Sequence, residues 1–183
     1  MKKIFLIAFM AVFTSSAFAQ LMTARMTTVK RSASTVWIDL GPGLYTGDVD
    51  DAGAGIDLGI RFTKMFGGGI GWDIFKASAQ TGTSKFTEIL DVQAKTGVRY
   101  VSPVLFGNQS LYANLGAGAG YYTDMDKFGF VWEVGAGINI TPRVSLGIAY
   151  NSHSFSQEIY DGRRTEDKSF NVGLISLRLG IGL

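Results

Sequence analysis

Apolar side chains alternate with small or polar side chains along most of this chain. The clearest stretch is residues 127–143, "KFGFVWEVGAGINITPR". Its even positions from Phe128 to Ile140 are apolar, whereas its odd positions are mostly glycine or polar. A period of two is typical of a β-strand whose two faces meet different surroundings. No segment of comparable length has the period of a helix.

The same alternation predicts eight strands. They cover residues 35–44, 55–63, 69–77, 90–100, 111–122, 128–140, 144–150 and 170–183. The connections near 64–68, 102–110 and 141–143 are short or modest, whereas those near 45–54, 78–85, 123–127 and 154–168 are longer and more polar. Short turns at one end and longer polar loops at the other predict an all-β fold, an eight-stranded antiparallel up-and-down transmembrane β-barrel over residues 35–183.

Two strands carry an irregularity. Pro42 cannot donate a hydrogen bond to a neighbouring strand, so we expect it near a strand end or at a bulge. In the last strand the apolar positions change phase, from Phe170 and Val172 to Ile175 and Leu177. A β-bulge between Gly173 and Ile175 would explain this change.

The less apolar face indicates which way the barrel is turned. A surface in water is rich in mixed charges, but this face is dominated by glycine, which packs nothing and suits a narrow interior. Its few charges nearly balance, as buried charges must. We predict a polar lumen with an ion-pair network of Asp57, Arg61, Asp73, Asp91, Lys95, Arg99, Glu133 and Arg178.

The apolar face is almost free of charge, which suits lipid because Lys or Arg at the membrane midplane costs about 2–4 kcal/mol. Aromatic residues gather near strand ends, as in the girdles of membrane barrels. We predict that the lipid-facing side chains include Ile56, Leu58, Ile60, Trp72, Phe128, Phe130, Trp132, Ile138, Leu146 and Ile148. A soluble lipocalin-like carrier, with the two faces reversed, is the competing barrel.

The first residues have the pattern of an export signal. Lys2 and Lys3 precede a ten-residue apolar run, and Ala17-Phe18-Ala19 has the small residues of a cleavage site. The run is too short to span about 30 Å of hydrocarbon. We therefore predict a signal peptide over residues 1–19 and an N-terminal periplasmic segment over residues 20–34.

Composition limits the possible chemistry. Removing Lys2 and Lys3 takes the formal charge from +2 to zero, so nothing points to nucleic acid. The chain has no cysteine and one histidine, which leaves little for a metal or haem site, and we expect no metal and no cofactor.

Three stretches contain candidate functional residues. In "NSHSFS", His153 could belong to a His–Ser–acid site with Ser152, Ser154 or Ser156 and with Glu158. Neighbouring strand residues such as His153 and Ser154 point to opposite faces, however, and we expect a surface histidine. Lipid A deacylases have a Ser two positions after the His, where this chain has Phe155. "GDVDDAG" at 47–53 lacks the ligands of a calcium loop, and the charged "YDGRRTEDK" at 160–168 is expected to be a solvated loop.

At the level of pattern, the chain resembles the small eight-stranded outer-membrane barrels of the OmpA/OmpX type, the porin-like outer membrane protein beta-barrel domain. The resemblance rests on the signal, on "GAGAGYY" and "FVWEVGAGINITPRVSLGIAY", and on the closing "SLRLGIGL". It implies insertion by the barrel-insertion machinery, although many members end in an aromatic residue where this chain has Leu183.

The sequence therefore predicts a monomer in the outer membrane of a Gram-negative bacterium, in contact with lipid and lipopolysaccharide. We expect a structural or surface-interaction role, with an unknown surface ligand, because eight strands leave an interior just filled by side chains. The alternatives are a lipid-modifying barrel enzyme, a narrow channel, and the soluble carrier.

Overall fold

The computed structural model describes residues 36–48, 53–83, 88–105, 107–123, 126–160 and 165–183. The predicted signal peptide (1–19) and periplasmic segment (20–34) lie outside these residues. Among the described residues, no helix is long and apolar enough to cross a membrane.

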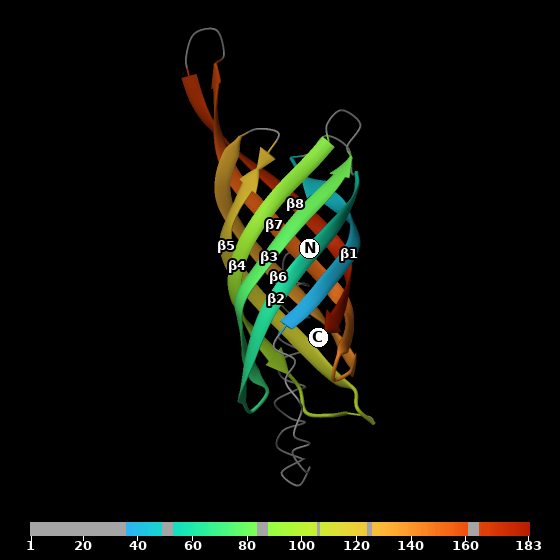
Figure 1. Ribbon diagram of the computed structural model, residues 1–183. Coiled ribbons are helices and arrows are strands. Elements are labelled where there is room, and N and C mark those ends of the chain that lie inside the picture. Colours follow the sequence, from blue (N-terminus) through green and yellow to red (C-terminus); the bar gives the residue numbers. More distant parts are fainter. Residues whose placement is uncertain (1–35, 49–52, 84–87, 106, 124–125, 161–164) are drawn as a thin grey trace, which may run out of the picture. The chain divides into compact units, whose positions relative to one another are not determined.

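Eight strands form one closed antiparallel barrel, as the sequence predicted (Figure 1). They are β1 (Val36–Gly47), β2 (Ala54–Gly67), β3 (Ile70–Thr83), β4 (Glu88–Val101), β5 (Ser110–Tyr122), β6 (Lys127–Thr141), β7 (Val144–Tyr160) and β8 (Thr165–Gly182). Each strand pairs with its neighbours in sequence, and β8 closes the barrel against β1. Closure leaves no free edge along the wall, which a sheet in lipid requires.

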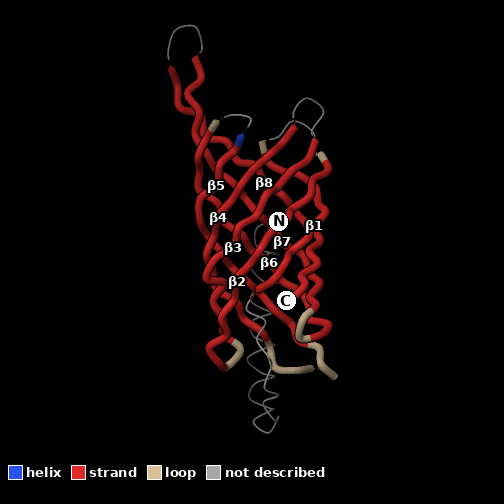
Figure 2. Tube along the Cα trace, in the orientation of Figure 1, coloured by secondary structure: helices blue, strands red, loops and turns tan. Residues whose placement is uncertain are grey.

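The two ends of the barrel differ in their connections. Strand β1 begins and β8 ends at one end, where the amide of Leu183 donates to the carbonyl of Val36 at 3.0 Å. The tight β2–β3 turn lies at this end, and Gly68 and Gly69 adopt positive φ of 58° and 80° there, which glycine allows without strain. We call this end the turn end and the opposite one the loop end (Figure 2).

Strands β7 and β8 rise well beyond the rest of the wall at the loop end (Figure 1). Above Ser154, β7 pairs only with β8, from Phe155 with Phe170 to Tyr160 with Thr165. The long loop predicted over 154–168 is therefore mostly a protruding hairpin. The loop predicted over 78–85 is likewise wrong, since β3 continues to Thr83.

The β-bulge predicted at Gly173–Ile175 does not exist. Strand β8 pairs with both neighbours there without a change of register, and its even-numbered residues from Val172 onward all face inward. A bulge occurs instead in β3. Phe62 pairs with Phe75 and Thr63 with Asp73, so that Ile74 is an extra residue.

Candidate functional site

The barrel lumen gathers the buried charges of the described chain. Five acids and five bases are at least nine-tenths buried there, so their formal charges cancel. They are Asp39, Asp57, Asp73, Asp91, Glu133, Arg61, Lys76, Lys95, Arg99 and Arg178. The eight residues of the predicted network are all among them, together with Asp39 and Lys76.

Glu133, on β6, lies at the centre of this network. Its carboxylate is 2.7 Å from Lys76 Nζ, 2.9 Å from Lys95 Nζ and 2.5 Å from an Arg178 guanidinium nitrogen. Asn114 also donates its amide N–H to Glu133, at 2.9 Å. One carboxylate thus accepts bonds from strands β3, β4, β5 and β8, and it joins opposite parts of the wall.

Further acid–base pairs continue the network toward the turn end. Arg61 donates to both carboxylate oxygens of Asp39, at 3.0 and 3.2 Å, and Arg99 donates to Asp73 at 3.3 Å. The guanidinium of Arg61 lies 5.0 Å from the ring centre of Trp37, and that of Arg99 lies 4.6 Å from the ring centre of Tyr112. These cation–π contacts explain how two large aromatic side chains occupy a polar lumen.

Toward the loop end, a chain of polar contacts leads to the single histidine. Arg178 donates to Asp57 at 2.8 Å, Lys95 donates to Gln93 at 2.7 Å, and Gln93 donates to Asp91 at 2.6 Å. Asp91 Oδ1 then lies 3.0 Å from His153 Nδ1. His153 is 1% exposed, so the prediction of a surface histidine is wrong.

Two glycines make the space for His153. A Cβ on Gly129 would lie 2.7 Å from His153 Nε2, and one on Gly120 would lie 3.1 Å from Cε1. A side chain at Gly129 would collide with the imidazole, and one at Gly120 would press tightly against it. The glycine-rich inner face of β5 and β6 thus has a definite packing role at this point.

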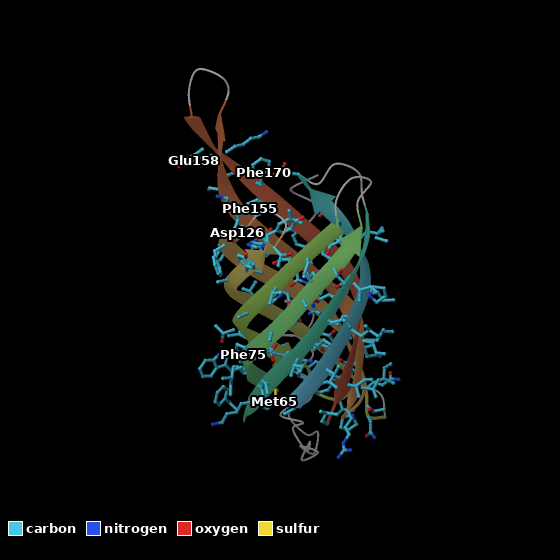
Figure 3. The ribbon with its side chains drawn as sticks, turned by 45° about the horizontal axis from the view of Figure 1, so that its top comes forward. Met65, Phe75, Asp126, Phe155, Glu158 and Phe170 are labelled. Carbon is cyan, nitrogen blue, oxygen red and sulfur yellow. The ribbon has the colours of Figure 1, made fainter. Side chains whose placement is uncertain are left out.

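Above His153 the lumen becomes apolar. Tyr45, Tyr122, Phe155, Val172 and Leu174 form a buried cluster, with Phe170 packed against it. The ring of Phe155 stacks with Tyr122 and Phe170, at centroid distances of 5.4 and 5.8 Å, and Figure 3 shows Phe155 and Phe170 at the base of the protruding hairpin. The apolar Phe170, Val172 and Leu174 of β8 therefore reflect an apolar section of the lumen, not a bulge.

The β3 bulge turns Lys76 inward, against the phase that regular alternation predicts. Before the bulge, the odd-numbered Asp73 faces inward; after it, the even-numbered Lys76, Ser78 and Gln80 do. The signal was present in the sequence: Ile74 and Phe75 are adjacent apolar residues in an otherwise alternating strand. Both are exposed on the outer face, and Figure 3 shows Phe75 outside the wall near the turn end. Asp39 is the other lumen charge outside the predicted network, and its position between the outward apolar Ile38 and Leu40 is the signal that places it inward.

The side chains predicted to face lipid all point outward. Eight are exposed large apolar residues: Ile56, Leu58, Ile60, Trp72, Phe128, Phe130, Leu146 and Ile148. Trp132 and Ile138 are half-buried on the same outer face. Trp132 is shielded by Tyr150, whose ring lies edge-on at a centroid distance of 5.2 Å.

The described residues do not form a metal site. They contain no group of three or more His, Cys, Asp or Glu placed to hold a metal. His153 points into the lumen, whereas Ser154, next to it on β7, points outward. Much of the "GDVDDAG" stretch and of the 160–168 loop lies outside the described residues.

The profile of the family described as Outer membrane protein beta-barrel domain matches residues 5–177. The chain belongs to this family. Members of this family lie in the bacterial outer membrane. The family resemblance and the location predicted from the sequence are therefore confirmed. The soluble carrier is thereby excluded. The comparison with curated proteins found no match.

Solved structures share the barrel at low sequence identity. The outer membrane enzyme PagL has a TM-score of 0.59 at 11% identity, covering 80% of this chain and 99% of that one. De novo designed transmembrane β-barrels have a TM-score of 0.53 at 14% identity, covering 83% and 98%. Neisserial surface protein A has a TM-score of 0.51 at 10% identity, covering 81% and 96%. At these identities the likeness shows the fold alone.

Proposed function

We propose that this outer-membrane barrel is a non-conducting, non-enzymatic anchor that holds the β7–β8 hairpin at the cell surface. The single observation that carries this proposal is the Glu133 network, in which one carboxylate binds three cations across the lumen. A charged interior of this kind is rigid because each group needs its partners to offset its lost hydration.

The packing of the lumen supports a closed interior. A cavity lined by Asp73, Lys76, Lys95, Asn114 and Glu133 has a volume of about 10 Å³. That is about the space of one water. The apolar cluster around Phe155 then covers the loop end of the network. A hydrated ion would have to displace both paired charges and packed rings.

The outward apolar face lies in lipid in this proposal, with the turn end in the periplasm. Membrane barrels of this kind have short periplasmic turns and longer external loops, which places the loop end outside the cell. There the hairpin presents exposed charged residues, among them Glu158 and Lys168, to a surface ligand or partner. The barrel is inserted by the barrel-insertion machinery and works as a monomer.

An enzymatic role has weaker support. A hydrolytic site on the lipid side would need a histidine beside a serine, but His153 lies in the lumen against Asp91, Tyr122 and Phe155. In the described part of the chain its imidazole has no path to an outward-facing serine, because the wall of β7 separates them.

Recording from purified protein in planar bilayers tests the closed lumen. We expect no unitary current steps above the background of protein-free bilayers, with Glu133 and the aromatic cluster intact. The narrow-channel alternative predicts steps of constant size that recur between preparations. Such steps would overturn the proposal of a non-conducting anchor.

A further inference from the structure

The apolar belt on the outer wall has an uneven height. On β6, outward apolar residues run from Phe128 to Ile140, whereas on β7 they run only from Val144 to Tyr150. With about 3.4 Å per residue and a strand tilt of about 40°, these spans are roughly 31 Å and roughly 16 Å high. Because Thr141 pairs with Val144 at the turn end, the missing height on β7 lies at the loop end.

Polar side chains occupy the missing part of the belt. Trp132 and Phe130 pair across the strands with Ser152 and Ser154, and these in turn pair with Gly173 and Asn171 on β8. Thr46, on β1, pairs with Gly173. We define the polar notch as Thr46, Ser152, Ser154 and Asn171, which lie on the outer side of three neighbouring strands. Ser152 is buried beneath its neighbours and supports Asn171, whereas the other three are exposed or half-buried.

The notch has hydrogen-bonding groups beside an aromatic flank. Ser152 donates to the side-chain oxygen of Asn171 at 2.7 Å. Among the described contacts, this leaves both N–H donors of the exposed Asn171 side-chain amide available to a partner. A Cβ on Gly173 would lie 2.5 Å from the Thr46 hydroxyl and 2.7 Å from the Tyr150 hydroxyl, so both oxygens converge there. The edge-on pair of Trp132 and Tyr150 borders this polar surface.

We propose that the polar notch binds the sugar headgroup of an outer-leaflet glycolipid, with the acyl chains lying on the wall below. This inference rests on the proposed orientation, in which the loop end faces the outer leaflet. The amide and hydroxyl groups match sugar hydroxyls and amides, and the aromatic flank matches the apolar face of a sugar ring. Where the apolar belt is short, the bilayer thins locally to match it. This thinning brings the lipid headgroups closer to the midplane.

The surroundings favour this amphipathic ligand over a free sugar or a second copy of the chain. Directly below the notch, Ile148 and Ile175 are 61% and 48% exposed, a surface suited to acyl chains. Asp48 borders the notch, and its carboxylate accepts from the backbone N–H of Asn171 at 2.8 Å. Its negative charge disfavours a bare phosphate at this point, so the notch binds the uncharged part of the headgroup.

The test is retention of lipid A by the full-length protein. Wild type is reconstituted in phosphatidylglycerol vesicles with lipid A, extracted in mild detergent, and its bound lipids are counted by native mass spectrometry. We expect lipid A to be enriched over phosphatidylglycerol, and Ser154→Leu and Asn171→Leu each to reduce that enrichment by about tenfold, the loss of one or two hydrogen bonds. Thr81→Leu is the matched control, because Thr81 is exposed on the outer face of β3. It should leave the enrichment unchanged.

Equal retention in all four proteins, or no enrichment in wild type, would overturn the inference. So would a concentration-dependent dimer of wild type that Asn171→Leu abolishes, which would assign the notch to a second copy. If the variants do not fold, Trp132 emission in a Trp37→Phe, Trp72→Phe background provides the test. It should shift to shorter wavelength when lipid A is added, and an unchanged spectrum refutes the site. Current steps in bilayers would refute the closed anchor but not this site.

Discussion

Among single residues, Glu133 has the largest share of the lumen contacts. It binds Lys76, Lys95 and Arg178 and accepts from Asn114, whereas Asp39 and Asp73 bind mainly at the turn end. Removing one member of a buried ion pair costs more than the pair contributes, because it leaves a charge without a partner. Glu133 therefore controls the stability of the whole interior.

Glu133→Gln should lower the free energy of unfolding by about 3 kcal/mol or more, since Lys76 and Lys95 lose their strong partner while the shape is kept. Glu158→Gln, an exposed site on the hairpin, is the matched control and should change it by less than about 0.5 kcal/mol. Urea unfolding of the reconstituted protein measures both. Equal midpoints for the two variants would show that the network does not stabilise the barrel.

Among the strands, β3 determines the composition of the lumen through its bulge. The extra residue turns both Asp73 and Lys76 inward, although they are separated by an odd number of positions. Lys76 then reaches Glu133, and Ile74 and Phe75 both remain on the outer wall. A regular strand would place Lys76 in lipid, where a cation costs about 2–4 kcal/mol at the midplane.

Deleting Phe75 should remove the bulge and still allow the barrel to assemble, because Ile74 alone then separates Asp73 from Lys76 and regular alternation keeps Lys76, Ser78 and Gln80 inward. The measurement is gel migration with and without heating, in which a folded barrel runs differently from the unfolded chain. Phe75→Leu keeps the register and should retain the folded band. A deletion variant that shows only the unfolded band would contradict this account, because the two adjacent outward residues would then be needed for more than the inward placement of Lys76.

The strands themselves were predictable from the sequence, but their exact phase was not. The alternation of apolar with small or polar residues located all eight strands, because neighbouring residues of a strand face lipid and lumen in turn. It failed where the lumen itself changes character, since Val172 and Leu174 face inward within an apolar section. It also could not show that Glu133 meets cations from three strands, because that depends on barrel closure and stagger.

For the whole molecule, the two faces of the wall form opposite environments. The described lumen holds equal numbers of buried acids and bases, whereas the outer wall carries exposed Ile, Leu, Phe and Trp. In the outer membrane, closure of the barrel provides hydrogen-bond partners for the backbone groups of the wall. The charged side chains pair in the lumen, and the apolar side chains contact lipid. Above Ser154 the β7–β8 hairpin forms a surface element that pairs with no other strand.

The three tryptophans provide the most direct test of the orientation of the wall. Trp72 and Trp132 lie on the outer face, whereas Trp37 is 8% exposed inside the lumen against Arg61. In single-tryptophan variants folded in vesicles, brominated acyl chains should quench Trp72 and Trp132 strongly and Trp37 weakly. Strong quenching of Trp37, with Trp72 and Trp132 quenched instead by a water-soluble agent, would contradict the orientation proposed here.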